Sequence, residues 1–315
     1  MILEAGLLIL GLVILAFFSD KTVDVAARLA ATAKIPPLLI GIVVLSVGTS
    51  LPEITTSVIS TVAGHPEINV GDIFGSSLSQ ITLIFGLSVL IAGPIREGRK
   101  DILLLGGCAI LGAMLALFVV ESGEITFLNA VFLIVSYFVL IFLSNKYTVK
   151  EYAAPEGKGA KKFWPWKDRI VGVGKLGVFL LGVIAGSILV IDSTISISTE
   201  MGVDSYLISF FGIALGTSLP ELFVCIAAIR RGQHELAVGN ILGSNITDTT
   251  LALASGPLIA PSVLPDIGLA SATGIYLVFA SIVVVGLFAW RKKLDRTAAL
   301  VLIGLYALSY LFVFA

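Results

Sequence analysis

Two glutamates, Glu53 and Glu221, each end a copy of the hexapeptide GTSLPE within this 315-residue chain. Each lies about midway along an apolar segment long enough to cross a membrane. A charged side chain at that depth costs roughly 2.5–3.5 kcal/mol, so it is a functional-site hypothesis by default. One such glutamate could be a protonated carboxyl that hydrogen-bonds to a neighbouring helix. Two in identical hexapeptides instead indicate one shared site inside the membrane.

The residues before each glutamate supply further oxygen atoms. A proline inside a helix has no N–H and clashes with the carbonyl four residues earlier, here at Gly48 and Gly216. This predicts loosened backbone carbonyls around Ser46–Gly48 and Ala214–Gly216, which lipid tolerates only where the break is buried or lines a polar cavity. Hydroxyls stand at the same level, on Thr49, Ser50, Thr217 and Ser218.

Carboxylates, hydroxyls and carbonyls together make an all-oxygen ligand set. Hard cations such as Ca²⁺ and Na⁺ prefer oxygen, and Ca²⁺ takes about six to eight such ligands. Neither hexapeptide contains His or Cys, which argues against Zn²⁺ or Cu²⁺. The pattern therefore predicts a cation-binding site, with no catalytic residue and no cofactor.

A second motif opens the next apolar segment of each half, as GSSLSQ and then as GSNITD. Ser76 and Gln80 lie four residues apart, so they share one face of a helix. The same spacing places Ser244 and Asp248 on one face. Glycines four residues apart, GxxxG pairs, occur in both segments and favour close helix packing.

These motifs belong to an internal duplication. The hexapeptides are 168 residues apart (217 − 49), and the register continues without a gap into the second motif. From Gly48 to Leu83, 15 of 36 positions are identical to the residue 168 places later. Self-similarity at this level indicates two structural repeats.

Composition places the whole chain in a membrane, since 57% of its residues are hydrophobic, 13% are charged, and its mean hydropathy is +1.05. Apolar runs of about 18 or more residues recur, and each can cross a hydrocarbon core as a helix. The first of them lacks the basic region and cleavage site of a signal peptide. The two cysteines, Cys108 and Cys225, fall in apolar runs and are predicted to be small buried residues.

From the apolar runs we predict an all-α polytopic membrane protein with ten transmembrane helices, at roughly 2–18, 37–63, 70–93, 102–120, 125–144, 171–199, 205–229, 236–260, 268–290 and 298–314.

All 20 Lys and Arg fall in alternate connections between these ten segments, and the intervening connections carry only acids. The positive-inside rule then places the basic connections in the cytoplasm and both termini outside. Five helices per half is an odd number, so the second half must enter the membrane from the opposite side. The predicted organisation is a pair of inverted five-helix repeats, 1–144 and 171–315, joined by a cytoplasmic linker at 145–170.

The doubled GTSLPE, each copy followed by Gly-Ser and a polar residue, resembles the alpha-repeats of the cation/calcium antiporter superfamily, especially prokaryotic sodium/calcium exchangers. The resemblance covers nearly the whole chain and implies ten helices with four ion sites in a diamond at the membrane midplane. The resemblance implies that Glu53 and Glu221 are carboxylates shared between the ion sites. It also implies that Thr49 and Thr217 bind ions through hydroxyl or carbonyl oxygens, and Ser46 and Ala214 through carbonyl oxygens. Ser76 and Ser244 would belong to the flanking sodium sites, and Gln80 and Asp248 would hold the middle site.

The function that this resemblance implies is a secondary antiporter of the cell membrane that exchanges Ca²⁺ for Na⁺ by alternating access. Sodium-coupled members usually carry Asn where Gln80 stands, and GSSLSQI is similar to the Gln-bearing motif of proton/calcium exchangers. An H⁺/Ca²⁺ exchanger of the same fold is therefore the alternative. The expected partners are Ca²⁺, Na⁺ or H⁺, and lipid, with one chain functioning as a monomer and no nucleic acid bound.

Three other classes of membrane protein compete with an antiporter. A nucleotide-driven pump would need a phosphate-binding motif such as Walker A, which the sequence lacks. An intramembrane protease would need a second paired aspartate. A cation channel could share the ligand set, but inverted repeats around one midplane site fit alternating access better.

Overall fold

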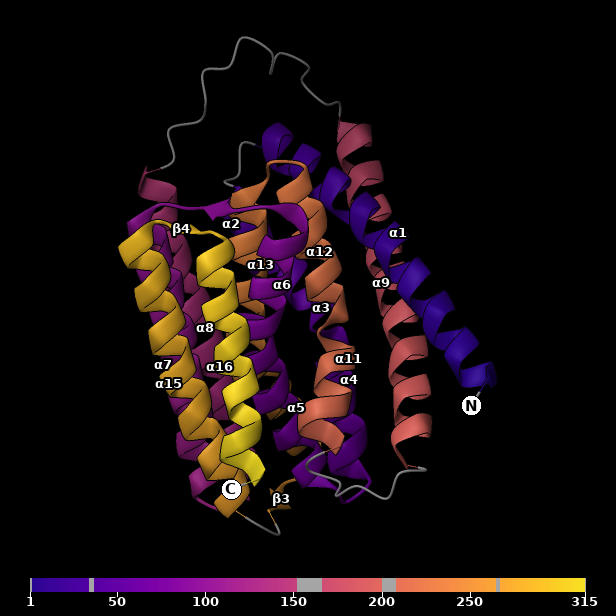
Figure 1. Ribbon diagram of the computed structural model, residues 1–315, viewed down its shortest axis with the longest axis vertical. Helices are drawn as coiled ribbons and strands as arrows, with labels where there is room; N and C mark the ends of the chain where they lie inside the picture. The colour runs from indigo at the N-terminus through magenta and orange to yellow at the C-terminus, as the bar shows by residue number, and fades with distance from the viewer. Residues whose placement is uncertain (1, 34–36, 152–165, 200–207, 265–266, 315) are drawn as a thin grey trace.

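The computed structural model describes residues 2–33, 37–151, 166–199, 208–264 and 267–314, and helices make up nearly all of them (Figure 1). The first half contains α1 (Ile2–Ala33), α2 (Pro37–Ile40), η1 (Gly41–Leu45), α3 (Ser46–Thr49), α4 (Leu51–Val62), α5 (Pro66–Ser79), η2 (Gln80–Ile84), α6 (Phe85–Ala92), β1 (Ile95–Arg96), α7 (Arg99–Glu121), β2 (Glu124–Ile125) and α8 (Phe127–Glu151). The second half contains α9 (Trp166–Thr199), η3 (Ile208–Ile213), α11 (Ala214–Thr217), α12 (Leu219–Arg230), α13 (His234–Thr247), η4 (Asp248–Ala252), α14 (Leu253–Ile259), β3 (Ser262–Val263), α15 (Gly268–Arg291), β4 (Lys293–Leu294) and α16 (Arg296–Phe314).

The predicted helical membrane architecture is confirmed. Within the described ranges, five helical stretches are long and apolar enough to cross a membrane, and a sixth is added if the bent pair Ser209–Thr217 and Leu219–Arg230 is one span. The five are Leu38–Val62, Pro66–Ala92, Arg99–Glu121, Phe127–Ser144 and Gly268–Arg291. Large apolar side chains such as Phe118 and Leu128 are 71% and 75% exposed on the outside of the bundle, a surface suited to lipid rather than water.

The first helix is longer than the predicted span 2–18, because α1 continues to Ala33. The polar residues beyond position 18 are compatible with a helix since their charges are paired. Arg28 lies 3.0 Å from Asp24, one helical turn earlier. Arg231, just after α12, lies 2.7 Å from Asp20 and 2.9 Å from Asp24. These ion pairs attach the end of α1 to the second half of the chain.

The helices on either side of the predicted linker 145–170 also extend further than expected. α8 continues to Glu151 and α9 begins at Trp166. The remainder of the predicted linker, 152–165, lies outside the described residues.

Within the described residues, four short π-helices divide the longer spans, and they were not expected from sequence. η2 begins at Gln80 and η4 at Asp248, two residues separated by the 168-residue offset of the duplication. η1 and η3 occupy equivalent places before the two hexapeptides. Because π-helices are rare and occur frequently at functional sites, their positions point to the same region as the sequence motifs.

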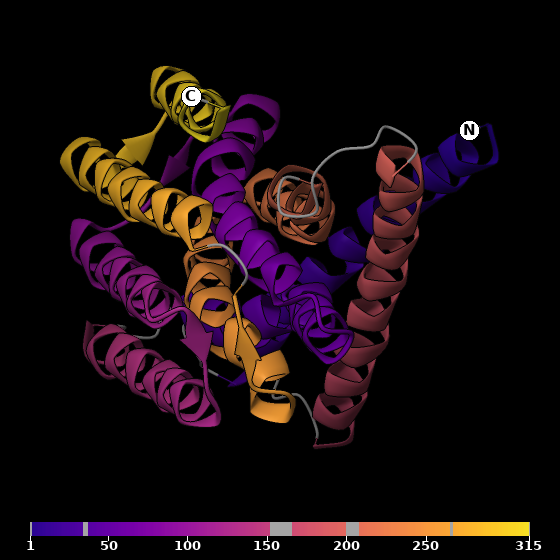
Figure 2. The same cartoon turned by 90° about the horizontal axis from the view of Figure 1, so that it is seen from below.

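In the described part of the chain, two small antiparallel sheets connect the halves. β1 pairs with β4, and β2 pairs with β3, so each sheet takes one strand from each half. Figure 1 places β4 at one end of the bundle and β3 at the other. The long helices α1 and α9 pack against each other along one side of the bundle (Figure 2). Their aromatic rings Phe18 and Phe179 lie 6.3 Å apart, centre to centre.

Glycine permits the closest approaches between the halves. A Cβ atom on Gly75 in α5 would lie 2.2 Å from the carbonyl oxygen of Phe210 in η3. A Cβ atom on Gly243 in α13 would lie 2.8 Å from the Cα atom of Ile42 in η1. The close packing predicted for the GxxxG segments is therefore confirmed at these two glycines. It presses α5 against the interrupted helix of the second half, and α13 against that of the first.

Candidate functional site

Both hexapeptides interrupt their helices at the serine before Leu-Pro-Glu. Ser50 separates α3 from α4 with ψ of 7°, and Ser218 separates α11 from α12 with ψ of 0°. The helices on either side of Ser218 meet at an angle of 42°. Glu53 and Glu221 stand in the first turn of the helix that follows each break. An interruption is present in both helices, as predicted, and it bends the second by 42° while Leu38–Val62 remains one span. Transporters use interrupted helices of this kind for ion sites.

The carbonyls of Ser46 and Ala214 are not freed by the breaks, contrary to the prediction. Ser50 N donates to the carbonyl oxygen of Ser46 at 2.9 Å, and Ser218 N donates to that of Ala214 at 3.1 Å. These bonds persist because the serines, unlike the prolines, carry an N–H. A carbonyl oxygen has a second lone pair, so each can still face a ligand.

The twelve predicted site residues are all fully buried. They are Ser46, Thr49, Ser50, Glu53, Ser76, Gln80, Ala214, Thr217, Ser218, Glu221, Ser244 and Asp248. Glu53 has no hydrogen-bond partner on either carboxylate oxygen, and Ser50 has none on its hydroxyl. Glu221 accepts a hydrogen bond from Ser244 Oγ at 3.2 Å through Oε1, while its Oε2 has no partner.

One hydroxyl cluster forms where the first hexapeptide meets α13. Thr49 Oγ1 lies 3.4 Å from Ser244 Oγ and 3.4 Å from Asn240 Oδ1. Ser46 Oγ lies 3.5 Å from Thr247 Oγ1 and also donates to the carbonyl of Ile42. This cluster therefore joins residues of both halves, and Ser244 connects it to Glu221.

A second cluster forms where the second hexapeptide meets α5. Thr217 Oγ1 lies 2.9 Å from Ser76 Oγ and donates to Asp72 Oδ1 at 3.2 Å. Ser76 Oγ is also 3.4 Å from the carbonyl oxygen of Ala214. One turn further along, Ser79 Oγ donates to Ser218 Oγ at 3.2 Å. The two clusters are counterparts under the 168-residue offset.

Gln80 and Asp248, one from each half, contact each other directly. Gln80 Nε2 donates to Asp248 Oδ2 at 2.8 Å. Asn245 Nδ2 donates to Gln80 Oε1 at 3.0 Å, which fixes the orientation of the Gln80 amide. Asp248 Oδ1 has no partner. The predicted proximity of these two motif residues is confirmed.

Sequence reasoning missed three polar residues of this layer, Asp72, Asn240 and Asn245. A signal existed for the first two, because each lies one helical turn before the predicted serine of its segment and on the same face. Asn245 replaces Ser77 of the first half, so the repeat alone did not mark it.

The ligand set is dominated by hydroxyls and carbonyls rather than by converging acids. In the part of the chain that the structure describes, no group of three or more His, Cys, Asp or Glu side chains is placed to hold a metal ion. The same part of the chain shows no ion pair between Lys, Arg or His and any of Glu53, Asp72, Glu221 and Asp248. Buried carboxylates without cationic partners are costly unless something else supplies positive charge.

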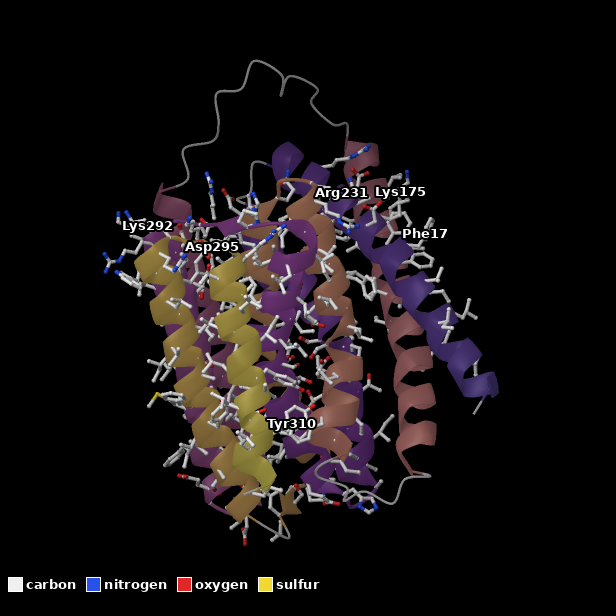
Figure 3. The ribbon with its side chains drawn as sticks, viewed as in Figure 1. Phe17, Lys175, Arg231, Lys292, Asp295 and Tyr310 are labelled. Carbon is white, nitrogen blue, oxygen red and sulfur yellow. The ribbon has the colours of Figure 1, made fainter. Side chains whose placement is uncertain are left out.

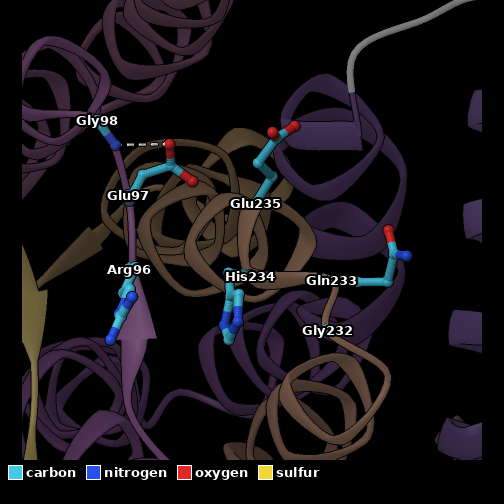
Figure 4. Close-up of a pocket in the computed structure, with 7 residues that line it drawn as sticks. All are labelled: Arg96, Glu97, Gly98, Gly232, Gln233, His234 and Glu235. Atoms are coloured by element: carbon cyan, nitrogen blue, oxygen red, sulfur yellow. Dashed lines mark hydrogen bonds between the residues drawn. The ribbon is translucent and has the colours of Figure 1, made fainter. Parts of the chain in front are cut away.

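A separate cavity of about 400 Å³ opens at the end of the bundle that carries Arg96 (Figure 4). Its acidic residues are Glu97 and Glu235, and Gly98 N donates to Glu97 Oε1 at 2.8 Å. Burial raises the pKa of Glu97 to about 7, and repulsion from Glu235 and Asp101 adds to the rise. This cavity lies outside the spans and shares no residue with the buried polar layer.

The raised pKa of Glu97 predicts a pH-dependent stability. A carboxyl whose pKa is higher in the folded state stabilises the fold fully below its unfolded pKa, and this contribution is lost as pH rises to about 7. We expect Glu97→Gln to melt at a higher temperature than the wild type, by a margin that grows from about pH 4.5 to pH 7 and is constant above. Thermal unfolding in detergent across this pH range measures the margin, with the exposed Glu121→Gln as control. A margin independent of pH would contradict the prediction.

Basic side chains gather at one end of the molecule. Figure 3 shows Lys175, Arg231 and Lys292 at the same end of the bundle, the end at which Figure 1 places β4. The N and C labels of Figure 1 lie toward the other end. Three residues from the predicted basic connections therefore share one end of the bundle.

Comparisons with known proteins agree with this architecture. The family described as sodium/calcium exchanger protein matches residues 3–145 and 171–315. The uncharacterized membrane protein MJ0091 of Methanocaldococcus jannaschii is 30% identical over 98% of this chain and 97% of its own length. The sodium/calcium exchanger MaX1 of Methanosarcina acetivorans is 25% identical over 89% of each chain. A structure of the sodium-calcium exchanger NCX_Mj superposes with a TM-score of 0.78 at 29% identity, covering 98% of both chains. The chain therefore belongs to the sodium/calcium exchanger family.

Proposed function

We propose that this protein is a secondary antiporter that exchanges Ca²⁺ for Na⁺ by alternating access. The observation that carries the proposal is the buried polar layer, in which Glu53, Glu221 and Asp248 keep carboxylate oxygens without a partner. These orphan oxygens lie among hydroxyls and carbonyls, the donor set that hard cations prefer. The names of the relatives, a sodium/calcium exchanger among them, support the same pair of ions.

The proposed architecture has ten transmembrane segments in two inverted halves, 1–144 and 171–315, with 145–170 as the linker. Support comes from the elements that recur 168 residues apart, namely the π-helices, the interrupted helices and the two hydroxyl clusters. The family match also falls in two segments, on either side of residues 146–170.

The proposed location is the cell membrane, with the basic end of the bundle in the cytoplasm and both termini outside. The gathering of basic side chains at one end supports this orientation through the positive-inside rule (Figure 3). The site is assembled from the two halves of a single chain, which supports a monomer as the functional unit.

The proposed roles follow the geometry. Glu53 and Glu221 neutralise the central Ca²⁺, and the two hydroxyl clusters bind the flanking sodium ions. Ser50 and Ser218, at the breaks, complete the oxygen layer. Gln80 holds Asp248 through its amide N–H, so the middle of the layer is kept polar by residues of both halves.

Coupling follows from charge. An empty site would carry uncompensated carboxylates through a closed, desolvated state, at a cost of several kcal/mol. One Ca²⁺ or several Na⁺ remove this cost, so the protein changes its access only when loaded. The candidates for the moving gate are α1 and α9, which pack mainly on each other at the side of the bundle (Figure 2).

Flux measurements test this function. Proteoliposomes loaded with Na⁺ and diluted into Na⁺-free choline medium should take up ⁴⁵Ca²⁺, because outward Na⁺ movement drives Ca²⁺ inward. Uptake should vanish when Na⁺ is equal on both sides, and a pH gradient alone should drive none. Glutamine at position 80, where sodium-coupled members usually carry Asn, makes H⁺ the alternative counter-ion. Uptake driven only by the pH gradient would establish H⁺ as the counter-ion. Uptake that needs neither gradient would instead identify a channel.

A further inference from the structure

Asp72 is a buried carboxylate in direct contact with a predicted sodium-site cluster. Its side chain is fully buried in α5, one turn before Ser76. Asp72 Oδ1 accepts hydrogen bonds from Thr217 Oγ1 at 3.2 Å and from Ser76 Oγ at 3.3 Å. Asp72 Oδ2 is buried and has no partner. One carboxylate oxygen of Asp72 is therefore hydrogen-bonded to the hydroxyls, and the other has no hydrogen-bond partner.

The duplication supplies an internal comparison. The residue 168 places after Asp72 is Asn240, which occupies the corresponding place beside Thr49, with Oδ1 3.4 Å from Thr49 Oγ1. The two side chains have nearly the same size and shape, but only one can carry a negative charge. The two flanking clusters are thus alike in hydroxyls and differ in charge.

The charge of Asp72 should affect cation binding because this carboxylate is buried without a counter-charge. Within the described residues, Asp72 forms no ion pair with Lys, Arg or His, and its described hydrogen-bond donors are neutral hydroxyls. A carboxylate held in this way is stabilised by a cation that sits against its open oxygen. The hydroxyls of Ser76 and Thr217 and the carbonyl of Ala214 supply neutral oxygens at the same point.

We propose that Asp72 is a direct ligand of a monovalent cation bound by Ser76, Thr217 and the carbonyl of Ala214, and that its charge makes this the tighter of the two flanking cation sites. The proposal rests on the proposed function in that it takes the flanking clusters to bind cations. It adds that the two clusters are not equivalent. The two flanking sites then differ in their affinity for the cation, one site binding it tightly and the other weakly.

Exchanging the two residues tests the proposal. In purified protein, melting temperature is titrated with NaCl against choline chloride at constant ionic strength, so that only specific Na⁺ binding shifts it. Asp72→Asn, which copies the residue at 240, should raise the NaCl midpoint about tenfold. Asn240→Asp, which copies the residue at 72, should lower it, because the weak cluster gains a charge.

The same variants separate this proposal from the proposed function. Calcium affinity, measured by equilibrium ⁴⁵Ca²⁺ binding without Na⁺, should change less in Asp72→Asn than the NaCl midpoint does. A rise of the midpoint below threefold in the folded variant, or an equal loss of Ca²⁺ and Na⁺ affinity, overturns the role of Asp72. If Asp72→Asn does not fold, the Asn240→Asp midpoint decides, and an unchanged value overturns the proposal. Failure of Na⁺-driven flux in the wild type would count against the exchange function and would leave the Na⁺ titration readable.

Discussion

Replacing Glu53 or Glu221 with Gln is expected to lower Na⁺-driven ⁴⁵Ca²⁺ uptake about 100-fold or more. Loss of one charge from a buried, desolvated pair of opposite charges costs about 2–5 kcal/mol, and each 1.4 kcal/mol is tenfold in affinity. Gln keeps the size of the side chain and one oxygen, so the change removes charge and little else. The initial rate of uptake in proteoliposomes measures the effect.

The stability of the same variants gives an independent check. Both oxygens of Glu53 are buried without a partner, whereas Glu221 accepts a hydrogen bond from Ser244. Removing an unsatisfied buried charge relieves its desolvation cost, so Glu53→Gln should melt at or above the wild-type temperature in cation-free buffer. A folded, stable variant without transport would separate function from folding. The exposed Glu124→Gln serves as the matched control and should leave uptake unchanged. Retained Ca²⁺ uptake in either buried variant would remove that glutamate from the site.

The sequence predicted the site better than the elements that hold it. Duplication placed GTSLPE and the Gly-Ser motifs in corresponding positions, and the structure brings Ser76 to Thr217, Ser244 to Thr49, and Gln80 to Asp248. These contacts between the halves were predictable because each motif has a counterpart at the corresponding position of the other half. Repeats that share one midplane site must present the same residues to each other.

Other features depended on contacts that no local pattern encodes. The segment after residue 18 is polar, and besides the local Asp24–Arg28 pair its charges are paired with Arg231, which is distant in sequence. The π-helices that begin at Gln80 and Asp248 leave no periodic signal in an apolar segment. The spacing of Asp72 from Ser76 could have marked its place on the helix face, but its contact with Thr217, 145 residues away, is visible only in the structure.

Gly75→Val is expected to destabilise the protein strongly and to abolish transport as well. A Cβ atom at position 75 would lie 2.2 Å from the carbonyl oxygen of Phe210 and 2.7 Å from the Cβ atom of Ala214. The first contact is with backbone, so a side-chain rotation cannot relieve it, and α5 must move away from η3 and α11. Overpacking of this kind costs typically about 1–3 kcal/mol and occasionally more, and a fall in melting temperature of roughly 2–5 °C should follow for a chain of this length.

The movement would also open the site, because Ser76 follows directly and its Oγ lies 2.9 Å from Thr217 Oγ1. Gly286→Val is the matched control, since Gly286 is exposed on α15 and nothing lies within 4 Å of the Cβ atom it would gain. Thermal unfolding and ⁴⁵Ca²⁺ uptake of both variants should show loss of stability and transport at position 75 and near wild-type values at 286. If Gly75→Val melted and transported like the wild type, the close approach of α5 to the second hexapeptide would not be what assembles the site. Because Glu53→Gln is expected to lose transport without losing stability, the two variants together separate the charge of the site from the packing that positions it.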